Sequence, residues 1–321
     1  MRASLRNLSA LFLLATATLV QAETGAEGWL RYAPITDTTR YATLPNKIVV
    51  LGSTPIDKAA ANELQRGLAS MLGRPFTISH EIGDGTSSIV LTNLSTLNKV
   101  FTVSGDNLPP ESYTLGQKKE GNSDRYIILG ADPRGELYGA FRLLELVASQ
   151  QPLPTKPATE SPSSPIRWVN HWDNLDGTIE RGYAGRSIFF DNGHVRSDLT
   201  RVHDYGRLLA SIGINGVTVN NVNSDLRTLQ PDMLREFARI ADQLRPWGVR
   251  ISLSVDLSSP QVVGKLPTFD PVDPTVMAWW QSKVDEIYTA TNTLSLHDAL
   301  PIWRCGRTRG SFRVRGCGGR S

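Results

Sequence analysis

The feature that most constrains the fold is a repeated alternation of short apolar runs and amphipathic helices in the second half of the chain. Each apolar run is typical of a buried strand, and the segments between them carry apolar residues at helical spacing. The runs lie at 166–170, 216–220 and 249–255, and the helices at 201–212, 231–244 and from Pro274 onward, after Asp273 as N-cap. Such units predict an α/β fold with parallel strands, either the opening of a (β/α)₈ barrel or an open sheet.

The same alternation, in shorter form, precedes this region. Strands are predicted at 47–52, 88–91 and 124–130, and helices at about 56–72 and 134–149. We therefore expect a small α/β domain over residues 23–150. The following stretch, 151–165, contains five prolines, which lack backbone N–H donors and favour extended conformations, so it is interpreted as a linker.

The N-terminal segment has the three parts of a secretory signal. Arg2 and Arg6 precede an apolar run at 8–20, and Val20 and Ala22 are the small residues before the predicted cleavage point. The run is shorter than the ~20 apolar residues that cross a bilayer. We therefore expect residues 1–22 to be removed and the protein to be secreted or periplasmic, the alternative being a buried N-terminal helix.

The C-terminal segment differs from the rest of the chain. The formal charge of the whole chain is +3, but six arginines and both cysteines lie after residue 302, and without these arginines acidic residues outnumber basic ones. A slightly acidic body argues against a nucleic-acid partner. The stretch 295–302 resembles the translation of a sequencing adapter. We expect 290–321 to be a tail that is disordered or a gene-model artefact, with a basic tail as the alternative.

Two segments at the predicted carboxyl ends of strands are candidate ligand-binding loops, because parallel sheets place ligands there. Residues 171–187 are rich in aromatic, carboxylate, amide and guanidinium groups and include Trp172, Arg181 and Arg186. Aromatic faces stack on sugar rings, and an arginine binds an acidic group with two hydrogen bonds. The competing interpretation is that Trp172 fills the core and the arginines pair with neighbouring acids.

The second candidate loop is the run from Asn220 to Asn223, which contains Asn221 and Val222. Its asparagines fit a ligand-binding edge, and they equally fit a polar turn stabilised by local hydrogen bonds. The sequence lacks the motifs of serine hydrolases, zinc proteases and nucleotide-binding loops, and its histidines lack metal-ligand spacing.

These segments together resemble the bacterial α-glucuronidases of glycoside hydrolase family 67. The resemblance runs continuously from about Glu27 to Tyr288 and is carried by these motifs: 28–32, 138–145, 170–177, 180–189, 213–223 and 279–288. It implies a small α/β domain, a central (β/α)₈ barrel and a helical C-terminal domain.

The resemblance also implies an activity. Members of the family remove 4-O-methylglucuronic acid from short xylan fragments by inversion, without a metal or other cofactor, so the partner would be an aldouronic acid or another glucuronoxylan oligosaccharide. No nucleic-acid or membrane partner is implied, and family members can dimerise through regions outside this chain. Trp172 and Val222 would enclose the methyl ether, and Asn221 would line the same pocket. Arg181 and Arg186 are placed only nearby, as candidate partners of the substrate carboxylate.

The catalytic residues of the family follow the fourth and later barrel strands. This chain leaves the family pattern at about Ala290, before a fourth strand, so no catalytic residue is assigned. Inversion requires an acid and a base on opposite sides of the scissile bond. We expect residues 166–289 to form the first three βα units of an incomplete barrel. We also expect a polypeptide of this sequence to be inactive. The alternative is a non-catalytic carbohydrate-binding protein of the periplasm.

Overall fold

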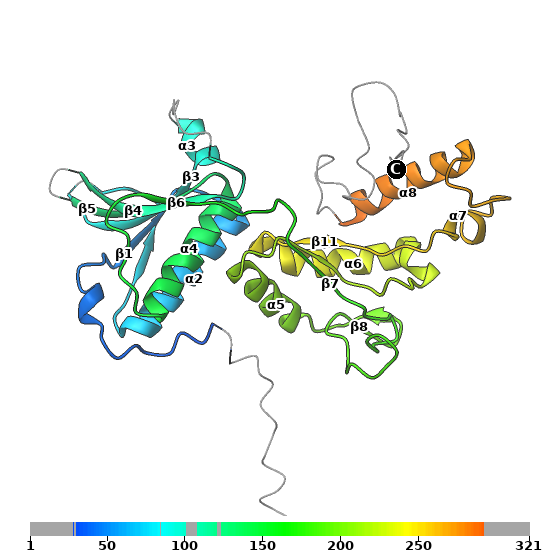
Figure 1. Ribbon diagram of the computed structural model, residues 1–321, viewed down its shortest axis with the longest axis horizontal. Coiled ribbons are helices and arrows are strands. Elements are labelled where there is room, and N and C mark those ends of the chain that lie inside the picture. Colours follow the sequence, from blue (N-terminus) through cyan, green and yellow to red (C-terminus); the bar gives the residue numbers. More distant parts are fainter. Residues whose placement is uncertain (1–27, 29, 84, 101–107, 121–122, 292–321) are drawn as a thin grey trace, which may run out of the picture.

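The computed structural model describes residues 28, 30–83, 85–100, 108–120 and 123–291 (Figure 1). The predicted signal peptide and residues 292–321 of the predicted tail (290–321) lie outside the described residues, whereas residues 290 and 291 belong to a helix that ends at Thr291. The described chain forms two α/β parts in sequence order, and a pair of helices of the first part lies between its sheet and the second part (Figure 1).

The first part is built on a mixed sheet of six strands. The strands are β1 (Lys47–Val50), β2 (Thr77–Ser79), β3 (Ser88–Asn93), β4 (Tyr113–Glu120), β5 (Ser123–Gly130) and β6 (Ala158–Glu160), in the order β2-β1-β3-β5-β4-β6. The first three and β5 are parallel, whereas β4 is antiparallel to both β5 and β6. The predicted strands β1, β3 and β5 are confirmed, and β2, β4 and β6 were not predicted.

Strand β6 corrects the interpretation of 151–165 as a linker throughout. Ala158, Thr159 and Glu160 pair with Leu115, Thr114 and Tyr113 at the edge of the sheet. Edge strands tolerate prolines because only one side of the strand forms ladder hydrogen bonds. The proline-rich stretch therefore begins and ends as irregular chain, and its middle belongs to the first sheet.

Two helices cover the sheet face that looks toward the second part. Helix α2 (Pro55–Leu72) begins at a capping box made by Thr54 and Asp57, and it ends at Gly73, whose φ of 63° is the left-handed geometry that glycine adopts without strain. Helix α4 (Pro133–Ala148) begins with Asp132 as N-cap. Both match the predicted helices. The short helix α3 (Leu94–Val100) follows β3.

The second part is a three-stranded parallel sheet with helices. The strands are β7 (Trp168–Asn170), β10 (Gly216–Thr218) and β11 (Arg250–Ser252), in the order β11-β10-β7. The helices are α5 (Thr200–Ser211), α6 (Pro231–Leu244), α7 (Ser259–Val262) and α8 (Pro274–Thr291), with 3₁₀ turns η2 (Thr39–Tyr41, in the first part), η3 (Leu226–Leu229) and η4 (Arg245–Trp247). The α/β class is thus confirmed in both parts. No described helix has the length and apolar character of a membrane span.

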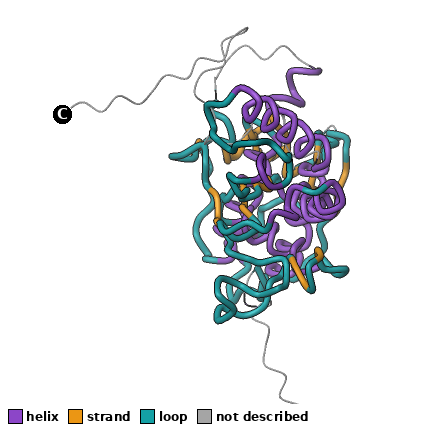
Figure 2. The backbone as a smooth tube through the Cα atoms, turned by 90° about the vertical axis from the view of Figure 1, so that its right-hand side faces the viewer, coloured by secondary structure: helices purple, strands orange, loops and turns teal. Residues whose placement is uncertain are grey.

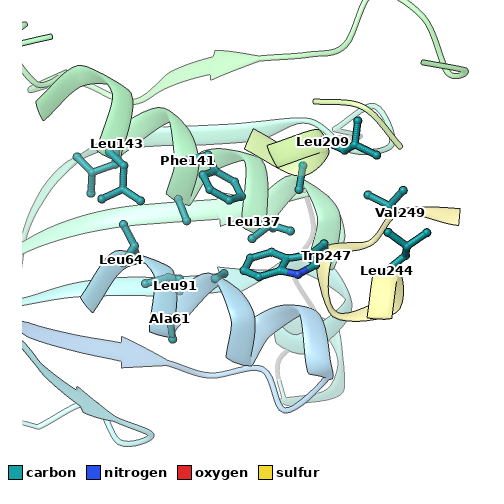
Figure 3. Packing of buried hydrophobic residues seen from close by; sticks show 14 of the residues in the cluster. Ala61, Leu64, Leu91, Leu137, Phe141, Leu143, Leu209, Leu244, Trp247 and Val249 are labelled. Atoms are coloured by element: carbon teal, nitrogen blue, oxygen red, sulfur yellow. The ribbon is translucent and has the colours of Figure 1, made fainter. Parts of the chain in front are cut away.

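The two parts share a continuous apolar core. Trp247 of η4 lies against α4, with its ring centroid 6.3 Å from that of Phe141 (Figure 3). Polar contacts reinforce this packing, because Arg134 Nε on α4 donates to the Gly248 carbonyl at 2.6 Å. Burial of a large aromatic side chain is a major source of stability at such an interface. The first part therefore supports the end of the second sheet that is opposite to the candidate loops.

Candidate functional site

The candidate site lies where β7 and β10 end side by side. The two strands pair in parallel, with Asn170 opposite Thr218, so the loops that follow them leave the sheet at the same edge. The loop after β7 is long, and Figures 1 and 2 show it, with strand β8, extending beyond the helices at one end of the molecule.

Tight turns give the β7 loop its shape. Asp176 Oδ1 accepts from the backbone N–H of Thr178 at 2.8 Å and from its hydroxyl at 2.7 Å. Gly177 has a φ of +89°, and a Cβ there would lie 3.0 Å from the Phe190 carbonyl oxygen. The N–H of Glu180 donates to the Trp172 carbonyl at 2.8 Å and closes the loop. The position of Trp172 is thus fixed by backbone hydrogen bonds.

A hairpin absent from the sequence predictions continues this loop. Strands β8 (Phe190–Asp191) and β9 (His194–Val195) are antiparallel and are joined by Asn192 and Gly193, both with positive φ. Helix α6 holds the hairpin, because Glu236 accepts from the N–H of Val195 at 2.7 Å. The Asn-Gly dipeptide is the standard sequence signal for such a two-residue turn.

Asn221 joins the two candidate loops. Its N–H donates to the Asp173 carbonyl at 2.8 Å, and its Nδ2 donates to Asn174 Oδ1 at 3.0 Å and to the Trp172 carbonyl at 3.4 Å. Its Oδ1 accepts from the N–H of Asn223, which is the local turn allowed for by the sequence. Asn221 therefore ties the loop that carries Trp172 to the loop that carries Val222.

A pocket of about 330 Å³ opens between these loops. Polar side chains dominate its lining, and amides, hydroxyls and carboxylates are the groups that bind sugar hydroxyls. The lining residues are Asp173, Asn174, Leu175, Asp176, Asn220, Asn221, Asn223, Ser224, Asp225 and Thr228.

The five predicted site residues occupy different surroundings. Trp172 and Val222 are 43% and 47% exposed, and Asn221 lines the pocket. Arg186 Nη2 donates to Asp191 Oδ1 at 2.9 Å, and the highly exposed Arg181 side chain lies 3.7 Å from a Glu180 carboxylate oxygen. The structure thus brings the loops of Trp172, Asn221 and Val222 together and leaves both arginines beside acids on their own loop.

The residues flanking Trp172 form a partly buried polar cluster with Tyr205, a connection that the sequence did not predict, although it indicated a packed or solvated His171 and a structural or substrate-orienting Asp173. His171 Nε2 lies 2.7 Å from the Tyr205 hydroxyl, and His171 Nδ1 lies 3.3 Å from Asp173 Oδ2. Asp173 is 1% exposed. Burial, and then the negative charge of Asp173, raises the pKa of Tyr205 to about 12, so the phenol keeps its proton. The alternating spacing 171 and 173, at the end of a strand, was the available signal.

The acids and hydroxyls of the β7 loop serve its structure. Hydrogen bonds from Thr178 hold the pKa of Asp176 below its ordinary value, whereas a general acid needs a raised pKa. Ser187 Oγ accepts from the N–H groups of Phe189 and Phe190 at 3.0 Å each. Within the described ranges, no three His, Cys, Asp or Glu side chains are grouped to hold a metal ion. The arrangement suits binding of a polar ligand.

Comparison with known families identifies both parts of the chain. Residues 28–143 match the glycosyl hydrolase family 67 N-terminus, and residues 146–295 match the glycosyl hydrolase family 67 middle domain. The second match begins before the predicted barrel start at 166 and ends a few residues after 290. The predicted domain limits otherwise stay predictions.

Curated relatives come from fungi. The chain is 43% identical to a probable α-glucuronidase A of Aspergillus niger and 44% identical to an α-glucuronidase A of Aspergillus tubingensis, each over 88% of this chain and 34% of the relative. An α-glucuronidase of Hypocrea jecorina is 43% identical over 87% of this chain and 34% of its own length. The chain therefore spans about a third of the length of these relatives. The specifically bacterial origin of the resemblance stays a prediction.

Solved structures share the fold at low sequence identity. A GH138 enzyme targeting pectin rhamnogalacturonan II has a TM-score of 0.50 and 14% identity, covering 77% of this chain and 30% of that one. A family GH115 4-O-methyl-α-glucuronidase with specificity for decorated arabinogalactans has a TM-score of 0.50 and 15% identity, covering 85% and 37%. The family matches and the curated relatives agree over nearly all of the described residues, and the chain belongs to glycosyl hydrolase family 67.

Proposed function

We propose that this chain is the sugar-binding portion of an α-glucuronidase that acts on xylan-derived oligosaccharides. The observation that carries the proposal is the hydrogen-bonded junction of the β7 and β10 loops, which holds Trp172 and Val222 half-exposed at one edge of a sheet. The names of the curated relatives from Aspergillus niger, Aspergillus tubingensis and Hypocrea jecorina, which are α-glucuronidases or a probable one, support the same activity.

The chemistry of the two loops fits a methylated uronic acid. An indole face and a valine side chain give an apolar surface for a methyl ether and for the C–H face of a sugar ring. The polar pocket beside them offers acceptors and donors for ring hydroxyls. One ligand that combines these features is 4-O-methylglucuronic acid at the end of an aldouronic acid, the substrate that the family resemblance implies.

The acids of these loops bind and shape the site in this proposal and take no part in proton transfer. Asp176 is occupied by Thr178, and Asp173 lies against His171. Inverting hydrolysis uses two carboxyl groups that flank the scissile bond, separated by about 6.5–9.5 Å. We therefore expect the described loops to hold the sugar while the acid and base come from other strands of the complete enzyme.

The finer architecture and the location are part of the proposal. Three parallel strands with intervening helices suit the first three βα units of a (β/α)₈ barrel, whose ligands bind at the carboxyl ends of the strands. Export to the periplasm or the medium rests on the three-part pattern of residues 1–22.

A calorimetric titration tests the proposal. The chain should bind 4-O-methylglucuronosyl-xylotriose saturably and bind xylotriose at least about tenfold more weakly, since a difference of ~1.4 kcal/mol corresponds to tenfold. Trp172→Ala and Val222→Ala should each weaken binding of the decorated ligand. Ile212→Ala is the matched control, because Ile212 is exposed but follows α5 at the opposite end of the sheet.

Two results would contradict the proposal. One is equal affinity for decorated and undecorated xylotriose, which would point to a general xylan-binding surface. The other is an equal effect of Ile212→Ala and Trp172→Ala, which would place the ligand away from the two loops.

A further inference from the structure

The side chains on either side of Trp172 are anchored in the helical layer. Successive side chains of an extended segment point to opposite faces, so His171 and Asp173 share a face that Trp172 does not. The ring of His171 packs edge-on against Phe189 at a centroid distance of 5.1 Å and against Tyr205 of α5 at 5.3 Å. Trp172 lies between these two anchored residues in the sequence, and its own side chain is 43% exposed.

The buried carboxylate of Asp173 depends on this histidine. Neither of its oxygens has a hydrogen-bond partner among the described residues, and His171 Nδ1 lies 3.3 Å from Oδ2. A buried charge without compensation is strongly destabilising. The contact between Asp173 and His171 is therefore required by the burial of the carboxylate as well as by the packing of the ring.

The hydrogen-bond directions follow from the chemistry of the two neighbours. The Tyr205 hydroxyl lies 2.7 Å from His171 Nε2 and is able to donate or accept there, whereas the ionised Asp173 carboxylate, 3.3 Å from Nδ1, can only accept. A proton on Nδ1 therefore suits the carboxylate and leaves Nε2 to accept from the Tyr205 hydroxyl. In that tautomer the contacts run in one direction, from the Tyr205 hydroxyl through the ring to Asp173.

We propose that Asp173 is a positioning residue: it fixes the Nδ1–H tautomer and the orientation of His171, and through this anchored pair it holds Trp172 toward the sugar. His171 and Asp173 are the two sequence neighbours of Trp172, so their contact restrains the backbone on both sides of it. Asn221 and the N–H of Glu180 donate hydrogen bonds to the Trp172 carbonyl. The part of this proposal that concerns the sugar rests on the proposed function. The tautomer and the orientation of Trp172 do not.

The first test needs no ligand. In ¹⁵N NMR spectra of the full chain, the imidazole signals of His171 are assigned as those that disappear in His171→Gln. These signals should show the Nδ1–H tautomer. Asp173→Asn should shift it toward Nε2–H, because an amide can donate to Nδ1, whereas Tyr205→Phe should retain Nδ1–H. Asp204→Asn is the matched control, since Asp204 is a more exposed acid beside Tyr205. An Nε2–H tautomer in the unaltered chain would overturn the proposal.

The second test follows Trp172 itself. The quenching of Trp172 fluorescence by acrylamide is obtained by subtracting the signal of Trp172→Phe from that of the unaltered chain. The same subtraction is made between Asp173→Asn and the double variant Asp173→Asn with Trp172→Phe. Asp173→Asn should change the quenching constant of Trp172 at least about twofold, and Asp204→Asn should not. An unchanged constant, with the tautomer altered and thermal unfolding still cooperative, would show that the pair does not position the indole.

The third test links the contacts among Tyr205, His171 and Asp173 to the sugar. Asp173→Asn should weaken binding of 4-O-methylglucuronic acid about tenfold, because the indole would lose its orientation toward the sugar, and Tyr205→Phe should weaken it less. If the unaltered chain binds no sugar, the proposed function fails while the first two tests still decide the positioning role. Normal affinity in Asp173→Asn would overturn the role in binding.

Discussion

Arg207 on α5 and Glu63 on α2 form a buried ion pair although 144 residues separate them in the sequence. Arg207 Nε donates to Glu63 Oε1 at 2.8 Å, and the Glu63 side chain is 1% exposed. Tyr32 also donates its hydroxyl to Glu63 at 2.5 Å, and Arg66 contacts the second carboxylate oxygen. Because one partner comes from each part of the chain, this pair connects the first domain to the second sheet.

Removing Arg207 should destabilise the whole described chain. Arg207→Met leaves the buried Glu63 carboxylate with only Arg66 and Tyr32 as partners, so we expect the free energy of unfolding to fall by about 3 kcal/mol. Arg142→Met is the control, because Arg142 pairs with the more exposed Glu145 and Glu160 and should lower stability by less than about 1 kcal/mol. Urea unfolding measures both. Equal losses in the two variants would contradict a linking role for Arg207.

A buried pair of acids predicts pH-dependent stability. Asn93 Nδ2 donates to Glu136 Oε2 at 2.7 Å and to Asp57 Oδ1 at 3.2 Å, and all three residues are fully buried. Burial, and then the negative charge of Asp57, raises the pKa of the Glu136 carboxyl from an ordinary 4.5 to about 8. Glu136 therefore holds a proton in the folded chain at pH values where the unfolded chain has released it.

The sign of the pH effect follows from this raised pKa. The stabilising contribution of protonated Glu136 is complete below pH 4.5 and is lost as the pH rises to about 8. The free energy of unfolding should fall over this range by an amount on the order of 5 kcal/mol. Glu136→Gln should remove most of this slope, and Glu81→Gln, at an exposed site, should retain it. An unchanged slope in Glu136→Gln would contradict the assignment.

The β7 loop depends on one glycine more than on its neighbours. Gly177 and Gly182 have nearly equal positive φ values, +89° and +90°, but only at Gly177 would a Cβ meet the chain, 3.0 Å from the Phe190 carbonyl oxygen. Left-handed geometry alone costs about 1–2 kcal/mol for an alanine. Gly177→Ala should therefore destabilise more than Gly182→Ala and should increase proteolysis within 177–186. Similar stability and proteolysis of the two variants would indicate that the loop relaxes.

The junction of the two candidate loops should fail when Asn221 loses its donor. In Asn221→Asp, a carboxylate oxygen would face the Asn174 Oδ1 and Trp172 carbonyl acceptors that Nδ2 now contacts. A buried group left without its partner costs about 1–3 kcal/mol, and more when it is charged. Asn223→Asp is the control, since Asn223 is exposed and contributes its backbone N–H. Thermal unfolding should separate the variants, and equal midpoints would refute the bridging role.

The sequence was most informative where periodicity and end signals agreed. Helix α6 was predicted at 231–244 because its apolar spacing lies between Pro231 and the Pro246-to-Gly248 stop, and the structure has the same limits. Strand β4 was missed because it carries Gly116 and two lysines, and it is held as a strand by pairing with β5 on one side and β6 on the other. That pairing is a tertiary property and leaves little local pattern.

Some features of the candidate site were likewise predicted from the sequence, and others were visible only in the structure. The two candidate loops were placed at the ends of predicted strands, and the family resemblance implied that Trp172, Asn221 and Val222 share one pocket. The structure joins the two loops by hydrogen bonds, and the binding role of these residues stays a prediction. The contact between His171 and Tyr205 joins residues that are 34 positions apart in the sequence and lie on different elements. No local sequence pattern predicts such a contact. The role of Arg181 and Arg186 in binding a carboxylate stays a prediction.

The most direct test of the account compares 4-O-methylglucuronic acid with unmethylated glucuronic acid by calorimetry on the same chain. If Trp172 and Val222 enclose the methyl ether, the methylated sugar should bind about fivefold to tenfold more tightly, as burial of one methyl group is worth roughly 1 kcal/mol. Trp172→Ala should abolish that preference. Equal affinity for the two sugars in the unaltered chain, or a preference that survives Trp172→Ala, would contradict the account.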